Sequence, residues 1–216
     1  HDPLIFKDND KYFLLSTDLD LEGVQYSTSR DLLSWSKDKV LIRRIPKSII
    51  EFAGNTRFWA PELVKRGNEY RLYVSSSSFG SQQSLISLFK SSNLDEDFQY
   101  VDNVVLSLDG SGIEEPNAID ANVVQDKNGQ DFIIYGSFFG GIYIKPLDKN
   151  GSAKGCSKGI RIAGGLNTPV EGAYIKYSFR DNLYYLFLSY GSLTYNYNIR
   201  YATSNDIQGP YIDSRG

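Results

Sequence analysis

Three carboxylic acids, Asp2, Asp120 and Glu171, each stand at the entry to a short β-rich run. Like charges that lie close together disfavour joint ionisation, so at least one pKa in such a group is raised. A protonated acid beside an ionised one is the arrangement that cleavage of a glycosidic bond needs. These three acids are therefore the candidate catalytic residues, provided that the fold brings them together.

A repeated segment indicates how the fold would bring the acids together. Each copy has a short β-rich run, a turn with Asn, Asp or Gly, and a second run rich in Tyr, Phe, Leu and Ile, which is typical of a β-hairpin. The copies begin at His1, Trp59, Ile119 and Val170. The residues that match between the copies are Pro3, Pro61, Ala121 and Ala173. Successive residues of this set are 58, 60 and 52 positions apart. A period of this size, with about four strands per unit, predicts propeller blades.

In a propeller the first strand of every blade lines the central channel, so equivalent positions from different blades meet at one mouth of it. Asp2, Asp120 and Glu171 would then share one pocket, whereas the second copy has Ala60 there. We expect one all-β catalytic domain over residues 1–216, with units at 1–57, 58–103, 104–165 and 166–216. Propellers usually close by pairing strands from both ends of the chain, so we expect a final blade downstream.

Composition narrows the class of partner. The hydrophobic fraction of 41% is that of a globular domain, and an aromatic fraction of 14%, mostly Tyr and Phe, favours β-structure. A net charge of −3 argues against a nucleic acid or an anionic membrane as partner. No apolar run approaches the roughly 20 residues that a membrane span needs.

Aromatic residues near the expected pocket are candidates for binding sugar. Trp59 lies beside an inner-strand entry, and Phe79 and Gly80 lie on the turn after the next strand. Ser137 and Phe138, just before a Gly-Gly pair, would face the same pocket. Such rings either pack in a core or stack on a sugar face.

Several motifs, spread over the whole chain in order, resemble the signature blocks of family 43 glycoside hydrolases, most closely the arabinanase-like members. They are HDP at 1–3, WAPE at 59–62, NAID at 117–120, YGSFFGG at 135–141, VEGAYI at 170–175 and YNIR at 197–200. The resemblance implies a five-bladed β-propeller, about four blades of which lie in this segment. It also implies hydrolysis of α-L-arabinosyl or β-D-xylosyl linkages with inversion of configuration.

The resemblance also implies residue roles. Asp2 would be the general base, Glu171 the general acid, and Asp120 the residue that tunes the pKa of the acid and orients it. The substrate-binding residues would be Trp59, Phe79, Gly80, Asn117, Ala118, Ile119, Ser137 and Phe138.

The motifs depart from the family pattern at four places. Arabinanases commonly read WAPD, IDPN, SFWGG and EAPY where this chain reads WAPE, IDAN, SFFGG and EGAY. The acids are retained, but Phe139 in place of Trp leaves the exact substrate open. His1 is the only His, so we assign no metal ligand and expect no required cofactor. A structural calcium-like ion in the central channel, held largely by water, stays open.

The sequence therefore predicts an inverting glycoside hydrolase that cleaves α-L-arabinofuranosyl linkages in arabinan or arabino-oligosaccharides. Alternatives are an exo-acting β-xylosidase or α-L-arabinofuranosidase, and a non-catalytic carbohydrate-binding propeller, which would need no acids at the channel. The expected partner is a plant cell-wall polysaccharide or oligosaccharide, arabinan or arabinoxylan, and the protein is expected to be a monomer. We expect an extracellular or periplasmic bacterial protein, or a cytoplasmic one if it is specific for oligosaccharides.

Overall fold

The structure, a computed structural model, describes residues 1–17, 23–36, 39–112, 115–153, 158–166 and 168–215. Within these ranges the strands form four antiparallel sheets, each in sequence order. The first contains β1 (Leu4–Asp8), β2 (Lys11–Ser16), β3 (Gln25–Ser29) and β4 (Lys39–Val40). The second contains β5 (Trp59–Arg66), β6 (Glu69–Ser76), β7 (Ser84–Ser91) and β8 (Gln99–Ser107). The third contains β9 (Asn122–Gln125), β10 (Asp131–Ser137), β11 (Gly141–Pro146) and β12 (Ile160–Ala163). The fourth contains β13 (Val170–Ser178), β14 (Leu183–Tyr190) and β15 (Asn198–Ser204).

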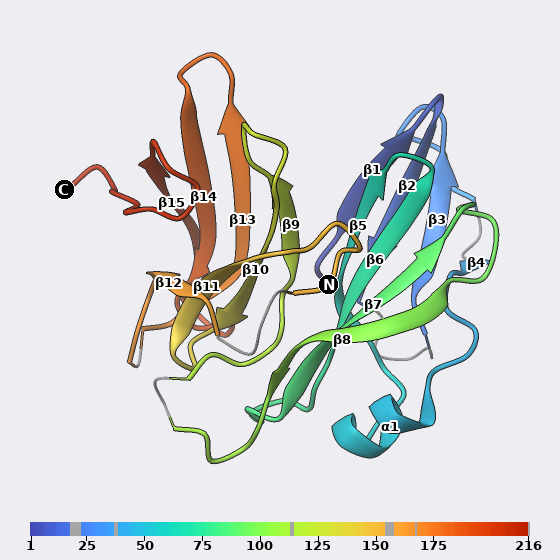
Figure 1. Cartoon of the computed structure of the whole chain (residues 1–216), viewed down its shortest axis with the longest axis horizontal. Helices are drawn as coiled ribbons and strands as arrows, with labels where there is room; N and C mark the ends of the chain where they lie inside the picture. The colour runs from blue at the N-terminus through green and yellow to red at the C-terminus, as the bar shows by residue number, and fades with distance from the viewer. Residues whose placement is uncertain (18–22, 37–38, 113–114, 154–157, 167, 216) are drawn as a thin grey trace.

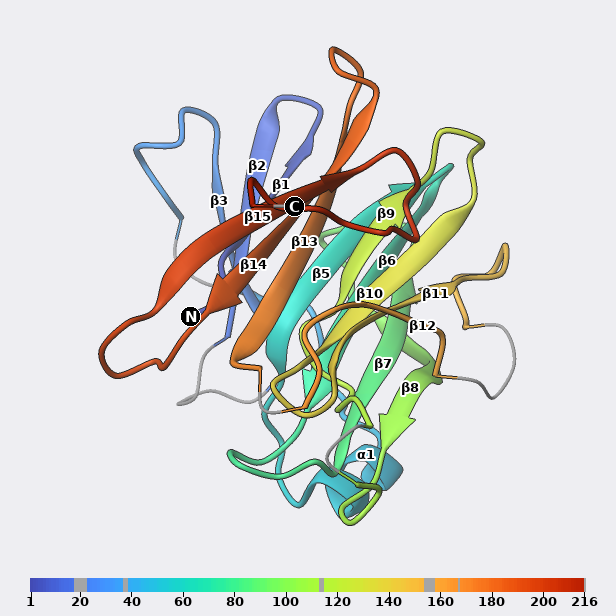
Figure 2. The same cartoon turned by 90° about the vertical axis from the view of Figure 1, so that its left-hand side faces the viewer.

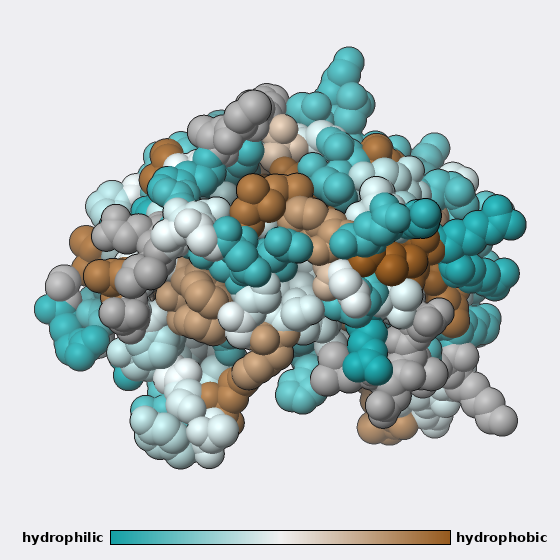
Figure 3. Space-filling view, turned by 90° about the horizontal axis from the view of Figure 1, so that it is seen from below, coloured by the Kyte–Doolittle hydropathy of each residue, from teal (hydrophilic) through white to brown (hydrophobic). Residues whose placement is uncertain are grey.

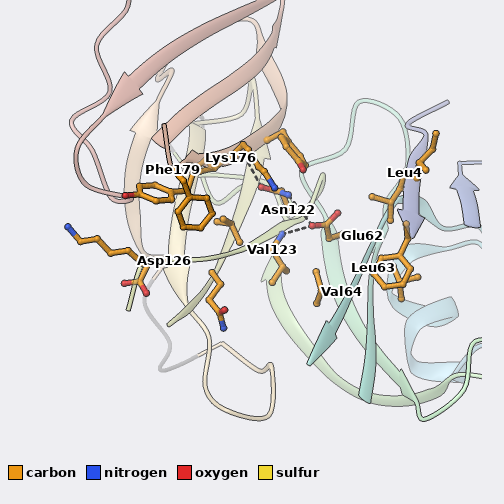
Figure 4. A pocket seen from close by; sticks show the side chains of 17 residues that line it. Leu4, Glu62, Leu63, Val64, Asn122, Val123, Asp126, Lys176 and Phe179 are labelled. Carbon is orange, nitrogen blue, oxygen red and sulfur yellow. Dashed lines mark hydrogen bonds between the residues drawn. The ribbon is translucent and has the colours of Figure 1, made fainter. Parts of the chain in front are cut away.

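The four sheets are the blades of a β-propeller (Figures 1 and 2). The first strand of each sheet faces the centre, and β1 contacts β5, β5 contacts β9 and β9 contacts β13. All four of these strands line one pocket, which is the central channel (Figure 4). The predicted all-β propeller is confirmed, and its inner strands are the ones that follow the predicted site motifs.

Alternating side chains build the core between blades. In β6, Leu72 and Val74 are buried against the first blade, whereas Tyr73 is buried against the third. In β10, Ile133 packs toward the second blade and Ile134 toward the fourth. Successive residues of a strand point to opposite faces of the sheet, so a strand that is apolar throughout is buried on both faces. This packing fixes how far apart the inner strands lie.

The second unit ends later than predicted. Strand β8 runs to Ser107, so the predicted boundary between 103 and 104 falls inside it. The pairing of β7 with β8 contains two register shifts, and the first four residues of β8 are exposed. These irregularities interrupt the alternation of buried and exposed side chains, so the sequence pattern did not show where β8 ends. The other two predicted boundaries fall between sheets.

One short helix, α1 (Lys47–Ala53), lies between the first and second sheets. No helix in the described ranges is long and apolar enough to cross a membrane. Seen from below in the orientation of Figure 1, separate hydrophobic patches lie among hydrophilic residues (Figure 3).

Candidate active site

The chain enters each inner strand through a residue in the left-handed backbone conformation. These residues are Asp2, Ala60, Asp120 and Gly172, with φ of 49°, 42°, 58° and 58°. This conformation is uncommon for residues other than Gly, and Asp is among the better tolerated. Its recurrence shows that the four blades share one local geometry at the mouth of the channel.

This geometry corrects one part of the predicted alignment. Gly172, not Glu171, occupies the position equivalent to Asp2 and Asp120. Glu171 is the residue before it and pairs with Ser189, just as Trp59, the residue before Ala60, pairs with Ser75. The prediction that all three acids share one register is therefore wrong for Glu171, although its position at the same mouth is not affected.

The three acids are close enough to influence one another. Burial raises the pKa of Asp120 to about 7, and the negative charges of Asp2 and Glu171 add to this effect. The side chain of Asp120 is surrounded by protein even though the residue retains some exposure. A carboxyl group in this state is partly protonated near neutral pH, beside two further acids.

Each acid is held by a neighbouring group. The Thr17 hydroxyl donates to Oδ2 of Asp2 at 2.6 Å. The backbone N–H of Gly172 donates to Oδ2 of Asp120 at 3.0 Å, and the Tyr197 hydroxyl donates to Oε1 of Glu171 at 2.8 Å.

Tyr197 remains a donor over the working pH range. Burial, together with its bond to Glu171, raises the pKa of Tyr197 to about 12, although Ser189 acts in the opposite direction. Neither Tyr197 nor Thr17 was predicted to be a site residue. Tyr197 begins the YNIR motif in a Tyr-rich run, which was a usable signal, but nothing in the local sequence marks Thr17.

The predicted aromatic residues lie at the surface. Phe79 is 88% exposed, and Phe138 is 46% exposed and packs against Phe139 with ring centroids 4.5 Å apart. Gly80 is exposed in the turn after Phe79, and Trp59 is half-buried next to Ala60. These four positions remain candidates for contact with sugar.

Four other predicted binding residues are buried. Ala118 and Ser137 have no exposed surface, and Asn117 and Ile119 retain only 3% and 7%. The Ser137 hydroxyl donates to Oδ1 of Asn117 at 2.7 Å, and Ala118 packs in the core between the second and third blades. The prediction of substrate contact is therefore wrong for Ala118 and Ser137, because the chain turns both inward. They support the segment that carries Asp120.

A second buried carboxyl group lies deeper in the channel (Figure 4). Oε1 of Glu62 accepts bonds from Asn122 Nδ2 at 3.0 Å and from the Val123 N–H at 2.8 Å. Oδ1 of Asn122 in turn accepts the Ile175 N–H at 2.9 Å, so three inner strands are linked. Burial raises the pKa of Glu62 to about 7.

The channel residues do not fit a metal ion bound directly by protein. In the ranges that the structure describes, no three His, Cys, Asp or Glu side chains form a group that could hold one. Oε1 of Glu62 and Oδ1 of Asn122 already accept hydrogen bonds within the protein. The calcium-like ion stays a prediction.

The fold and the acids at its channel mouth define the class of propeller glycoside hydrolases. The family model for glycosyl hydrolases family 43 matches residues 1–216, and the chain belongs to this family.

Similar proteins agree with this assignment. An extracellular endo-α-(1→5)-L-arabinanase of Thermotoga petrophila is 35% identical, over all of this chain and 51% of that protein. The structure of a family 43 endo-arabinanase from Bacillus licheniformis is 32% identical with a TM-score of 0.89, covering 100% of this chain and 75% of that one. An exo-1,5-α-L-arabinanase structure from a bovine ruminal metagenomic library is 30% identical with a TM-score of 0.88, covering 100% and 74%. The chain spans about half the length of the T. petrophila relative.

Proposed function

We propose that this protein hydrolyses α-1,5-linked arabinan with inversion of configuration. The observation that carries the proposal is Asp120, at the mouth of a propeller channel, whose pKa is raised by burial and by the charges of Asp2 and Glu171. A purely sugar-binding propeller has no need of such a group. The names of the relatives supply the substrate, arabinan, and favour endo action for the first of them.

In the proposed reaction Asp2 takes a proton from a water molecule, whose oxygen attacks the anomeric carbon. The bond from that carbon to the leaving oxygen breaks, and Glu171 gives its proton to this oxygen. Asp120 holds the N–H of Gly172, the residue after Glu171, and therefore positions the acid through the backbone. The three acids act on one another through their charges, because a negative charge on one of them favours the protonated form of its neighbours.

The proposal also covers the location of the protein and its polysaccharide partner. The relative in T. petrophila is named extracellular, which supports an extracellular location here. The partner would be arabinan outside the cell, and arabinoxylan is the alternative polymer. The monomeric state stays a prediction.

The test measures sugar released from linear α-1,5-arabinan by the unsubstituted protein and by Glu171→Gln. We expect the rate to fall at least about a hundredfold, in line with loss of general acid catalysis. Glu51→Gln, which removes an exposed carboxyl group on α1, is the matched control and should leave the rate unchanged.

Two further readouts sharpen this test. NMR of the first product formed should show the β-anomer, and the length distribution of early products separates endo from exo action. Binding of arabinan without any release of sugar would contradict hydrolysis and favour the carbohydrate-binding propeller. Release from aryl xylosides but not from arabinan would favour the xylosidase.

A further inference from the structure

The residues beside the four left-handed positions, on the second strand of each blade, form a second equivalent set. The pairing of β1 with β2 and of β9 with β10, extended to the mouth of the channel, places Thr17 opposite Asp2 and Gly136 opposite Asp120. In the other two blades Ser75 and Ser189 pair with Trp59 and Glu171, the residues just before Ala60 and Gly172. Three of these four residues carry a hydroxyl group.

These hydroxyl groups connect consecutive blades. Oγ1 of Thr17 accepts the N–H of Ala60 at 2.8 Å, and Oγ of Ser75 accepts the N–H of Asp120 at 3.1 Å. Each hydroxyl thus holds the left-handed residue of the next blade. A left-handed residue leaves its N–H outside the regular ladder, so this bond satisfies a group that would otherwise lack a partner.

The third blade replaces the hydroxyl with a carboxylate. A side chain on Gly136 would place its Cβ 2.3 Å from the carbonyl oxygen of Gly141, so no hydroxyl fits there. The N–H of Gly172 is instead bound by Oδ2 of Asp120. The site carboxylates and the hydroxyl groups therefore belong to one set of contacts between blades.

Thr17 differs from Ser75 in what it faces. Ser75 pairs with Trp59, next to Ala60, and meets no carboxylate in its own blade. Thr17 faces the Asp2 carboxylate, to which its hydroxyl donates at 2.6 Å. A hydroxyl has one proton, and here that proton is directed to Asp2 while an oxygen lone pair accepts the Ala60 N–H. These two hydrogen bonds fix the orientation of the Thr17 hydroxyl. Because the hydroxyl binds Oδ2 of Asp2, Oδ1 of Asp2 is the oxygen available to a water molecule.

We propose that Thr17 is a positioning residue for Asp2, which sets the orientation of this carboxylate relative to the second blade. Asp2 is an exposed residue in a left-handed conformation, so its own chain segment does little to hold its side chain. Thr17 is only 8% exposed and is bonded to both blades. The inference rests on the proposed function, in which Asp2 activates water.

The first test compares Thr17→Val, which keeps the branched shape but lacks the hydroxyl, with Thr17→Ser, which keeps the hydroxyl. On linear arabinan we expect kcat of Thr17→Val to fall about tenfold to a hundredfold, as misplacement of a catalytic group does, with KM within about twofold. Thr17→Ser should retain kcat within about threefold. Ser87→Ala, which removes a buried hydroxyl bonded to Asn103, is the matched control and should lower stability without changing kcat.

A double-mutant cycle separates positioning from a general effect on the fold. In the Asp2→Asn background, Thr17→Val should cause no further loss of rate, because the group that it positions no longer acts as a base. Equal losses in both backgrounds, an unchanged kcat in Thr17→Val, or a Thr17→Ser variant as slow as Thr17→Val would each overturn the proposal. If Thr17→Val does not fold, Thr17→Ala takes its place in both tests.

The outcomes also distinguish the two proposals. If the unsubstituted protein releases no sugar, the proposed function fails and the role of Thr17 fails with it. If it is active but its rate is insensitive to removal of the Thr17 hydroxyl, only the positioning role fails.

Discussion

Glu62 and Asp120 are carboxyl groups that the fold keeps partly protonated near neutral pH, and their positions in the channel differ. Asp120 lies at the mouth of the channel, where neighbouring acids add to the effect of burial. Glu62 lies within the channel and ties β5 to β9 through Asn122 and Val123. Both have a pKa of about 7 in the folded state, well above the value of an unfolded chain. The folded protein therefore binds these protons more tightly than the unfolded protein does, and both groups stabilise the fold most at acidic pH.

At the residue scale, Glu62→Gln tests this pH dependence. The stabilising contribution of Glu62 is fully present below about pH 4 and is lost as pH rises through about 7. Gln retains the Oε1 acceptor but does not ionise, so the variant should become more stable than the unsubstituted protein by up to about 3 kcal/mol at pH 8. Free energies of unfolding from urea titrations at pH 5, 6, 7 and 8 measure the difference.

The exposed Glu51→Gln variant is the control, and its stability should follow that of the unsubstituted protein. A constant difference between Glu62→Gln and the unsubstituted protein across this range would contradict the raised pKa.

At the element scale, the second strand of the third blade depends on a glycine. Gly136 has φ of 115°, and its position in β10 lies directly against the Gly141 carbonyl of β11. This close approach places Ser137 inward and allows Asp120, rather than a hydroxyl, to hold Gly172. The shape of one hairpin thus determines which group contacts the segment that carries Glu171.

Gly136→Ala should destabilise the protein by about 3 kcal/mol or more, because a methyl group there overlaps backbone that cannot move without breaking the β10–β11 pairing. Gly129→Ala is the matched control, since Gly129 also has a positive φ, 85°, but open space around it. That change should reduce stability by only about 1 kcal/mol. Denaturant unfolding measures both, and equal losses would contradict the role assigned to the close contact.

The sequence predicted most of the elements and only part of the site. The four predicted hairpins are the β1–β2, β5–β6, β9–β10 and β13–β14 pairs, because alternating apolar runs and turn residues are local signals. Which of the adjacent residues Glu171 and Gly172 adopts the left-handed conformation depends on the folded backbone and leaves no mark on composition. The inward orientation of Ala118 and the contact of Thr17 with the second blade depend on how blades pack, and a single strand carries no signal of that.

At the scale of the whole molecule, the blades are also joined at the end of the channel away from the acids. Arg66, at the end of β5, makes a bidentate contact with Asp131, at the start of β10, at 2.7 and 2.8 Å. Arg71 lies 3.8 Å from the same carboxylate. The ion pair between Arg66 and Asp131 is largely buried, so removing the Asp131 carboxylate leaves the positive charges of Arg66 and Arg71 without a negative partner there.

Asp131→Ala should therefore lower the free energy of unfolding by about 3 kcal/mol. Its kcat on arabinan should change by less than about twofold, because the pair lies at the opposite end of the strands from Asp120. Asp10→Ala breaks an exposed pair with Arg30 and should reduce stability by at most about 1 kcal/mol. Thermal unfolding and initial rates test both variants, and a large loss of kcat in folded Asp131→Ala would contradict the separation of the two ends.

The contacts that hold the acids also determine where two related propellers can be recombined. The hydrogen bonds that join Asp2 to Thr17 and Thr17 to Ala60 span the first part of the chain. Those that join Ser75 to Asp120 and Asp120 to Gly172 span the rest. A crossover in a loop between whole sheets splits one of these four bonds, even though every sheet is inherited intact. The turn between β5 and β6, at Gly67, splits none of the four, so a chimaera joined there inherits each of these contacts from a single parent.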